Sequence, residues 1–408
     1  MKRLLLSMAT VPLLVGGLSV SASAQEGFNL LSDAKFSGQI RPRFEYANVK
    51  ENSKDAASAF TARVRLAVEA NLLEVDGLSA KIGLTSVNNF GYTDYAPVDI
   101  TYETILDPQQ AIVSEAYVSY KVADTTLLAG RSHVNLDDQR FIGTVGWRQM
   151  ERAYDTVTVI NSSVKDLTLI GAYVYGYQGV NANPTADTAS VLLNANYKAN
   201  EALVVSGFAY MLADIHDTFG VRLSGKLPLE GIKLDYAASY AMQSDASLDY
   251  SSASNANIEA SYYDLALNAN ISGVILGAEY EVLGKADGSS INGFTTPLAT
   301  LHKFQGFADE FLGQTASANK NGLIDMSAKI GYADKTLGKA LLIYHDFSAE
   351  TGSATDLGSE IDALYTNKVP GVNNLGLLLK AAYYQAGETG LTHQNDNAKF
   401  WAQLDYKF

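Results

Sequence analysis

The sequence predicts an all-β protein: an antiparallel up-and-down transmembrane β-barrel of about eighteen strands, with long external loops and short periplasmic turns. Three observations lead to this fold class. Apolar and polar residues alternate with a period of two in segment after segment, and the connections between segments alternate between long and short. The composition also fits, with 24 tyrosines, 33 glycines, only eight prolines and no cysteine.

The alternation is clear in residues 61–71, TARVRLAVEAN, where Ala62, Val64 and Leu66 share one face. The opposite face carries Thr61, Arg63, Arg65 and Glu69. A charge-free face opposite a charged one is typical of a strand with one face in an apolar environment. The same pattern recurs at residues 232–243, 323–332 and 399–408.

Eighteen such segments can be placed along the chain. They are centred near residues 42, 66, 83, 117, 129, 157, 172, 193, 207, 222, 237, 265, 277, 327, 343, 361, 380 and 403. Even-numbered connections are short, as at 123–124, 199–201 and 230–231, whereas the longest odd-numbered one runs from Gly284 to Asn321. Segregation of loop length by parity is expected of a barrel in an asymmetric membrane and has no reason to occur in a soluble sandwich.

A closed barrel also accounts for the missing cysteines, because every strand is paired on both sides and no sheet edge needs a stabilising disulfide bond. After the first two dozen residues, no run of about 18 apolar residues occurs that would form a transmembrane helix. Tyrosines at strand ends are expected to anchor the barrel at headgroup level. The candidates for this girdle are Tyr46, Tyr197, Tyr236, Tyr240, Tyr332 and Tyr406.

Residues 1–24 are predicted to be a cleaved secretory signal peptide, which leaves residues 25–408 as a single barrel domain. Lys2 and Arg3 precede an apolar run, and Ala22-Ser23-Ala24 has the small residues of a cleavage site. Loss of that segment changes the formal net charge from −14 to −16. A chain this acidic repels phosphates, so no nucleic-acid partner is expected.

The chain ends on an alternating strand with Phe400, Leu404, Tyr406 and Phe408 on one face. A terminal strand that ends in Phe resembles the signal read by the outer-membrane barrel-assembly machinery, so Phe408 is the predicted assembly signal. The expected location is the outer membrane of a Gram-negative bacterium. The expected partners there are outer-membrane lipid and lipopolysaccharide, and a monomer is favoured.

Arginines cluster on the charged faces of the first two predicted strands. Arg41 and Arg43 share one face, as do Arg63 and Arg65, and charge on the lipid side would cost about 2–4 kcal/mol per residue. These four are therefore predicted to line the pore, with Arg131 extending the patch. Two interpretations remain open: the arginines attract anionic solutes, or they pair with the inward Glu45, Glu69 and Glu115 and brace the wall. The glutamates temper the positive field in either case.

Residues 135–149, NLDDQRFIGTVGWRQ, form the least regular stretch and lie between the fifth and sixth strands. Phe141, Ile142, Val145 and Trp147 make this loop too apolar to extend freely into water, so it is expected either to fold inward or to pack over the mouth of the pore. The predicted constriction residues are Asp138, Arg140, Trp147 and Arg148. Their charges either line the constriction or hold the loop to the wall by buried salt bridges.

Three blocks, residues 127–155, 294–313 and 357–365 with the terminal strand, resemble the alginate-export family of outer-membrane porins. The first contains AGR followed by LDDQRFIGTVGWRQ, and the second is the long-loop block FTTPLATLHKFQGFADEFLG, in which a short helix is possible. The resemblance implies an eighteen-stranded monomeric barrel with an anion-lined pore path. A dedicated conduit for a polyanion would carry a dense basic lining, whereas this chain has only ten arginines.

The sequence favours a channel for passive or facilitated diffusion of small hydrophilic, mainly anionic solutes such as sugar acids and carboxylates. Export of an acidic polysaccharide such as alginate is the alternative, and a barrel enzyme or adhesin is less favoured. The histidines at 133, 216, 302, 345 and 393 are scattered, and only His345-Asp346 suggests half of a hydrolytic pair. No enzyme activity, cofactor or metal site is therefore expected. An inward Trp401 could form a stacking surface for sugars.

Overall fold

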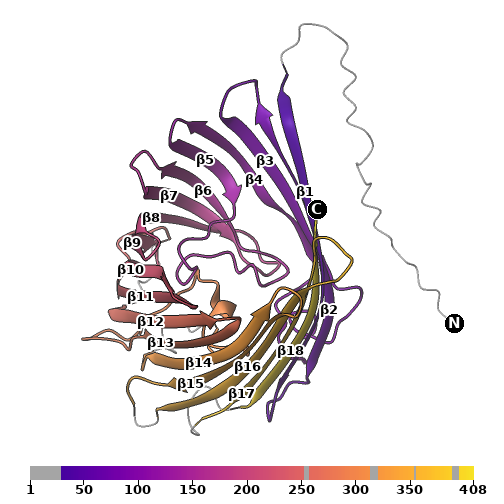
Figure 1. Ribbon diagram of the computed structural model, residues 1–408, viewed down its shortest axis with the longest axis vertical. Helices are drawn as coiled ribbons and strands as arrows, with labels where there is room; N and C mark the ends of the chain where they lie inside the picture. Colours follow the sequence, from indigo (N-terminus) through magenta and orange to yellow (C-terminus); the bar gives the residue numbers. More distant parts are fainter. Residues whose placement is uncertain (1–28, 252–256, 313–319, 353–354, 388–394) are drawn as a thin grey trace, which may run out of the picture.

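The computed structural model describes residues 29–251, 257–312, 320–352, 355–387 and 395–408, and the predicted signal peptide 1–24 lies outside these ranges. Eighteen antiparallel strands form one sheet that closes on itself, because β1 pairs with β18 as well as with β2. Figure 1 shows the strands arranged in sequence order around the ring. The predicted fold class is confirmed.

The strands are β1 (Leu31–Val49), β2 (Ala57–Leu72), β3 (Leu78–Asn88), β4 (Gln110–Val122), β5 (Thr125–Ser132), β6 (Ala153–Asn161), β7 (Leu167–Gln178), β8 (Ala186–Asn200), β9 (Leu203–Leu212), β10 (His216–Leu229), β11 (Ile232–Ser244), β12 (Ala260–Ile271), β13 (Val274–Leu283), β14 (Leu323–Asp334), β15 (Gly338–Ser348), β16 (Asp356–Lys368), β17 (Leu375–Gln385) and β18 (Asn397–Lys407). Each predicted centre falls inside one of them. The possible helix in block 294–313 is a 3-10 helix, Leu301–Lys303. No helix of the described part of the chain is long and apolar enough to cross a membrane.

Loop length follows parity with one exception. One end of the barrel has tight turns such as 123–124, 230–231 and 272–273, and we call it the short-turn end. The opposite end carries the long loops 89–109, 133–152 and 284–322. The exception is the connection 213–215 between β9 and β10, which is short although it belongs to the long-loop end.

The two faces of the sheet differ as the alternation predicts. The outer face exposes a belt of large apolar side chains, among them Val64, Leu66, Ile82, Leu84, Val118, Leu193, Leu265, Leu267, Ile330, Leu342, Ile361 and Phe400. Of the predicted girdle tyrosines, Tyr197, Tyr240, Tyr332 and Tyr406 are exposed, whereas Tyr46 and Tyr236 are half-buried. An exposed apolar belt around a closed sheet is the surface that lipid tails favour.

The inner face is largely covered, because loops from the long-loop end fold into the lumen. Figure 1 shows the magenta 133–152 segment and the orange 284–312 segment inside the ring. Every strand contributes a buried inward side chain. Examples in strand order are Arg43, Arg63, Thr85, Ser114, Ser132, Thr156, Val174, Leu192, Tyr210, Thr218, Ala241, Tyr262, Glu281, Asp325, Phe347, Glu360, Tyr384 and Trp401. The inserted loops therefore set the width of any path through the barrel.

A pair of neighbouring substitutions on β12 tests the assignment of faces. Leu265 is exposed on the outer face, and the next residue, Ala266, faces the lumen opposite Glu279. Leu265→Arg should lower the free energy of unfolding from lipid vesicles by about 2–4 kcal/mol, because it places a charge against the hydrocarbon. Ala266→Arg should cost clearly less, since it meets a carboxylate in the lumen. Equal losses in a urea titration of the two variants would contradict the assignment.

Candidate functional site

The register of β1 and β2 brings four arginines together on one wall of the lumen. Arg41 lies directly opposite Arg63, and Arg65 lies opposite Gln39. Residues opposed in an antiparallel pair share a face, so these guanidinium groups are neighbours on the inner surface. The structure thus assembles the predicted cluster of Arg41, Arg43, Arg63 and Arg65.

Arg41 and Arg43 are almost completely buried, and their donors are taken up by the loop 133–152. Arg41 donates to the carbonyl oxygens of Gly146, at 2.9 Å, and of Arg148. Arg43 donates to the Trp147 carbonyl oxygen and forms a 3.3 Å ion pair with Asp107. Backbone carbonyls of an inserted loop need hydrogen-bond donors, and these two arginines supply them. Their geometry fits the bracing interpretation.

Arg65 lies nearer the short-turn end and is less completely enclosed, whereas Arg63 is level with Arg41 and equally buried. Arg63 is 2.8 Å from Glu151 at the end of the loop, and Arg65 pairs with Glu115. Arg65 keeps 22% of its side chain exposed, against 3% for Arg63. Of the four arginines, Arg65 is therefore the one most accessible to a solute.

A cavity of about 470 Å³ lies on the short-turn side of the loop, against this wall. Its polar lining consists of Ser37, Gln39, Arg41, Arg63, Arg65, Glu151, Asp405 and Lys407, and Gly146 contributes the loop backbone. We call it the arginine cavity. Solvent-accessible space therefore lies directly against the basic wall.

The three predicted lumen carboxylates have different roles. Glu45 accepts two hydrogen bonds from Arg148, at 3.0 and 3.1 Å, and Glu115 binds Arg65 and Lys81. Glu69 faces the lumen in register with Lys35 and Lys81 but is exposed, and among the described residues no ion pair joins it to an arginine. Two of the three thus take part in bracing.

The prediction that Arg131 extends the lumen patch is wrong. Arg131 is opposed to Ala116 and Asp155, on the same face as the exposed Val118 and Val157. It therefore lies on the outer face, at the long-loop end of β5, and makes a bidentate pair with Asp155 at 2.7 Å for both contacts. Pairing within the sheet neutralises a charge that would otherwise face lipid.

Of the two predicted placements, the loop 133–152 takes the inward one, and its apolar residues hold it in place. Phe141 packs at 4.9 Å from the ring of Phe208 and at 5.3 Å, edge to face, from Tyr262. Ile142 is fully buried. A Cβ added at Gly143 would lie 2.3 Å from the Thr300 hydroxyl, so glycine is required where the loop crosses 284–322.

Each charged residue predicted in the loop forms an ion pair with a different part of the barrel. Arg140 binds Glu281 of β13 at 2.5 Å, and Asp138 lies 3.0 Å from Arg222 of β10. Arg148 joins Glu45 of β1 to Asp309 of the second inserted loop, which is the segment 284–312. These contacts favour the bracing interpretation for Arg140 and Arg148.

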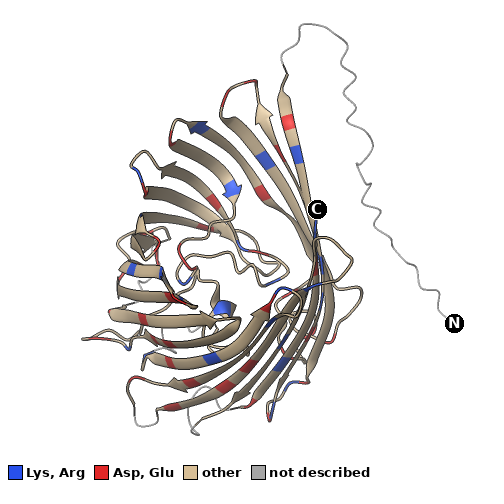
Figure 2. Cartoon of the chain, in the orientation of Figure 1, with Lys and Arg blue, Asp and Glu red and all other residues tan. Residues whose placement is uncertain are grey.

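Residues that the sequence interpretation did not single out form an acidic wall across the lumen. Figure 2 shows acidic residues recurring on neighbouring strands from β12 to β16. The inward carboxylates are Asp264, Glu279, Glu281, Asp325, Glu360 and Asp362. Glu360 and Asp362 accept hydrogen bonds from the backbone N–H groups of Ala308 and Phe307, so this wall anchors the second loop.

Trp147 lies where the two inserted loops meet. Its indole stacks on His302 with ring centroids 4.3 Å apart and meets Trp401 edge to face at 5.7 Å. Lys380 lies 3.9 Å from the Trp147 ring centroid and donates to His302 Nε2 at 2.9 Å. Trp401 faces inward as predicted, but it is fully buried, so it offers no stacking surface to a sugar.

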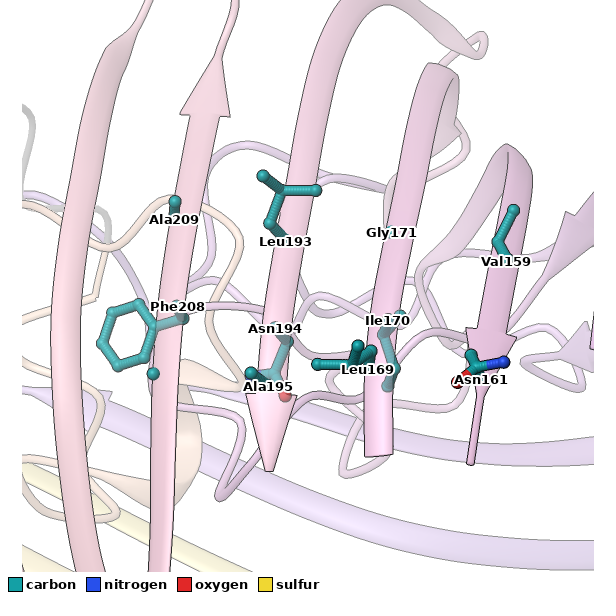
Figure 3. Close-up of a pocket in the computed structure, with 11 residues that line it drawn as sticks. Val159, Asn161, Leu169, Ile170, Gly171, Leu193, Asn194, Ala195, Phe208 and Ala209 are labelled. Atoms are coloured by element: carbon teal, nitrogen blue, oxygen red, sulfur yellow. The ribbon is translucent and has the colours of Figure 1, made fainter. Parts of the chain in front are cut away.

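His345 and Asp346 do not form the suggested pair, because consecutive strand residues point to opposite faces. His345 lies in the lumen, 2.9 Å from Asp325, whereas Asp346 is opposed to the outward Met326. Another hollow, of about 560 Å³, crosses β6 to β9 beside Gly171 (Figure 3). Its exposed rim residues Val159 and Leu193 place it on the apolar outer face, away from any path for hydrophilic solutes.

The contacts of His302 predict that docking of the second loop depends on pH. Burial holds the pKa of His302 well below its ordinary value; Asp309 opposes this shift and Lys380 adds to it. The released loop would therefore bind a proton below about pH 6.5, where the docked loop does not. Docking should weaken as the pH falls from 7 to 5, by at most about 1.4 kcal/mol per pH unit.

Hydrogen exchange of residues 301–312 measures this dependence, and His302→Gln should abolish most of it. Asp309 stays ionised over the same interval, because its pKa is lowered chiefly by His302 and Lys399 against the opposing effect of burial. Equal pH dependence in the wild type and the His302 variant would refute the role of this histidine.

Comparison with known proteins gives a structural likeness only. No protein-family model matches the chain, and no curated protein matches its sequence. The resemblance to the alginate-export family is therefore not supported.

Solved structures match over nearly the whole chain. OccAB2 of Acinetobacter baumannii has a TM-score of 0.73 at 15% identity, covering 94% of this chain and 99% of that one. The outer membrane protein OpdK of Pseudomonas aeruginosa has a TM-score of 0.71 at 13% identity, covering 94% and 100%. OccK9 (OpdG) of the same organism has a TM-score of 0.70 at 17% identity, covering 93% and 99%. The chain has the closed eighteen-stranded fold of these outer-membrane porins.

Proposed function

We propose that this chain forms a channel in the outer membrane of a Gram-negative bacterium, through which small hydrophilic anions such as sugar acids and carboxylates diffuse. The observation that carries the proposal is the arginine cavity. It joins about 470 Å³ of open lumen to a wall that contains Arg63 and Arg65, with Lys407 nearby. Basic groups lining a narrow, low-dielectric passage attract anions and raise their local concentration.

The difference in burial between the two charged walls supports a preference for anions. The acidic residues Asp264, Glu281 and Asp362 are buried beneath the inserted loops and their ion pairs. Arg65, in contrast, presents part of its side chain to the cavity. Arg65 is paired with Glu115, but part of its side chain stays exposed, so we expect it to act on a solute more than the buried carboxylates do.

Small solutes are favoured over an exported polysaccharide by the filling of the lumen. Buried side chains from all eighteen strands pack inside the barrel, and loops 89–109, 133–152 and 284–312 bring further buried residues into it. A polymer needs a wide, continuous path, whereas a small acid needs only a narrow gap beside the loop. Arg41 and Arg43 are also occupied by loop carbonyls, so few free guanidinium groups remain for a polyanion.

The proposed partners follow from the location. Phe408 leaves its ring exposed at the short-turn end, while its backbone N–H and carbonyl pair with Gly38. Recognition of this terminal strand by the barrel-assembly machinery would precede closure of β18 onto β1. Outer-membrane lipid and lipopolysaccharide would then surround a monomer.

Planar-bilayer recording in a salt gradient tests the proposal. The wild type should show a reversal potential that favours anions, and Arg65→Gln should reduce the anion-to-cation permeability ratio roughly threefold by removing an exposed cation. Lys335→Gln removes the same charge at the turn between β14 and β15, outside the cavity, and should have little effect. A wild-type channel that prefers cations, or one that does not conduct, would refute the proposed function.

A further inference from the structure

Glu151 is the one carboxylate of the loop 133–152 that faces the arginine cavity. We propose that its side chain is an internal substitute for the carboxylate of a transported solute: it occupies the binding position between Arg63 and Arg65, and the solute displaces it. The inference rests on the proposed function and specifies which group of the solute is bound, where, and against what competition.

The contacts of Glu151 are those expected of a bound carboxylate. One oxygen lies 2.8 Å from Arg63 and 3.9 Å from Arg65, and the other lies 4.0 Å from the ring of His133. Arg63 and Arg65 are two residues apart on one face of β2, so their guanidinium groups flank a single anion. Pairs of guanidinium groups recognise carboxylates by directed, charge-assisted hydrogen bonds, which a spherical ion such as chloride satisfies less well.

Glu151 is charged at neutral pH. Burial by itself would raise the pKa of this carboxyl, but Arg63, His133 and Arg65 together lower it below its ordinary value. The negative charge on the arginine pair is thus present throughout the range in which a solute carboxylate is also ionised. Solute and side chain are then competitors of the same chemical type.

The side chain can leave its position without moving the loop, because the neighbouring residues hold the backbone. Gln149 donates to Thr61 at 3.0 Å, and Arg148 donates to Glu45 at 3.0 Å. On the other side, Arg152 donates to the carbonyl of Gly143 at 3.2 Å. Rotation of Glu151 away from the arginines therefore breaks its 2.8 Å contact with Arg63 and its longer contacts with Arg65 and His133, and it leaves these backbone-holding contacts intact.

Glu115, the other carboxylate bound to Arg65, is not displaceable in the same way. It also binds Lys81 at 3.0 Å, is nearly buried, and packs at 3.3 Å from the position that a Cβ on Gly83 would take. Glu115 is thus a fixed part of the barrel wall, whereas Glu151 lies where a solute would pass. The difference identifies Glu151 as the residue that sets how tightly a carboxylate binds.

Competition of this kind has a use in a channel. Binding must be strong enough to favour entry and weak enough to permit release. The carboxylate of Glu151 returns to the arginines as the solute leaves. Arg63 and Arg65 therefore have a carboxylate partner both with and without bound solute. Replacement of Glu151 by a neutral isostere should therefore tighten binding and slow release.

The test uses the full-length protein in planar bilayers, with chloride as the current carrier and gluconate as the probe. Glu151→Gln should lower the gluconate concentration that half-blocks the chloride current about tenfold, which corresponds to about 1.4 kcal/mol. Chloride conductance should change less than twofold. Glu151→Asp keeps the charge on a shorter arm and should fall between the wild type and Glu151→Gln.

Glu69→Gln is the matched control. Glu69 lies on the inner face of the same strand as Arg63 and Arg65 and carries the same charge, but it does not line the cavity, and among the described residues no ion pair joins it to either arginine. Its substitution should leave gluconate block within about twofold of wild type. Hydrogen exchange of residues 141–150 serves as the check that Glu151→Gln keeps the loop docked.

The outcomes separate the two hypotheses. An anion-selective wild type in which Glu151→Gln leaves gluconate block unchanged would overturn the role of Glu151 and leave the proposed function standing. Equal tightening in Glu69→Gln would also overturn it, because net charge would then explain the effect. A cation-selective wild type would remove the proposed function itself, whatever the variants do.

Discussion

The arrangement of the lumen depends on guanidinium groups that meet the backbone of the loop 133–152. A loop folded into a barrel brings carbonyl groups away from water, and each needs a donor. Arg41 and Arg43 provide these donors from β1, and Arg148 returns a cation from the loop to Glu45 on the same strand. This exchange of charge and hydrogen bonds fixes the loop, and the loop in turn fixes Trp147, Glu151 and the arginine cavity beside them.

The sequence leaves two alternatives for the arginines, bracing of the wall and attraction of anions. In the structure, different arginines fit different alternatives. Arg43 is fully enclosed and Arg41 nearly so, and both are bound to the loop. Arg65 is two residues further along the inner face of β2 than Arg63 and is the most exposed. On the inner face of β1 and β2, the arginines nearer the long-loop end thus hold the loop, whereas Arg65, nearer the short-turn end, is accessible to solutes. The reason is that the loop covers only the part of this face nearer the long-loop end.

Most of the fold could be predicted from the chain, and one error in the site could have been avoided. The period-two pattern placed the strand centres correctly, since each inward or outward residue has a strong energetic preference. Arg131 was assigned to the lumen because it is charged, although it shares a strand face with Leu127 and Ala129, which point outward. Its partner Asp155, on the next strand, neutralises the charge and so allows an arginine on the outer face. Such a partner can be identified only when the register between the two strands is known.

The sequence by itself determined the number of strands, the alternation of their faces, the parity of the loops, and the packing of an apolar loop against the barrel, because all of these follow from local alternation and burial. Only the tertiary structure decided which charges meet. Asp107, Glu281 and Asp309 lie far from Arg43, Arg140 and Arg148 in the chain, yet each pair forms an ion pair. Such contacts depend on the closure of the sheet and on the path of the inserted loops, which local patterns do not encode.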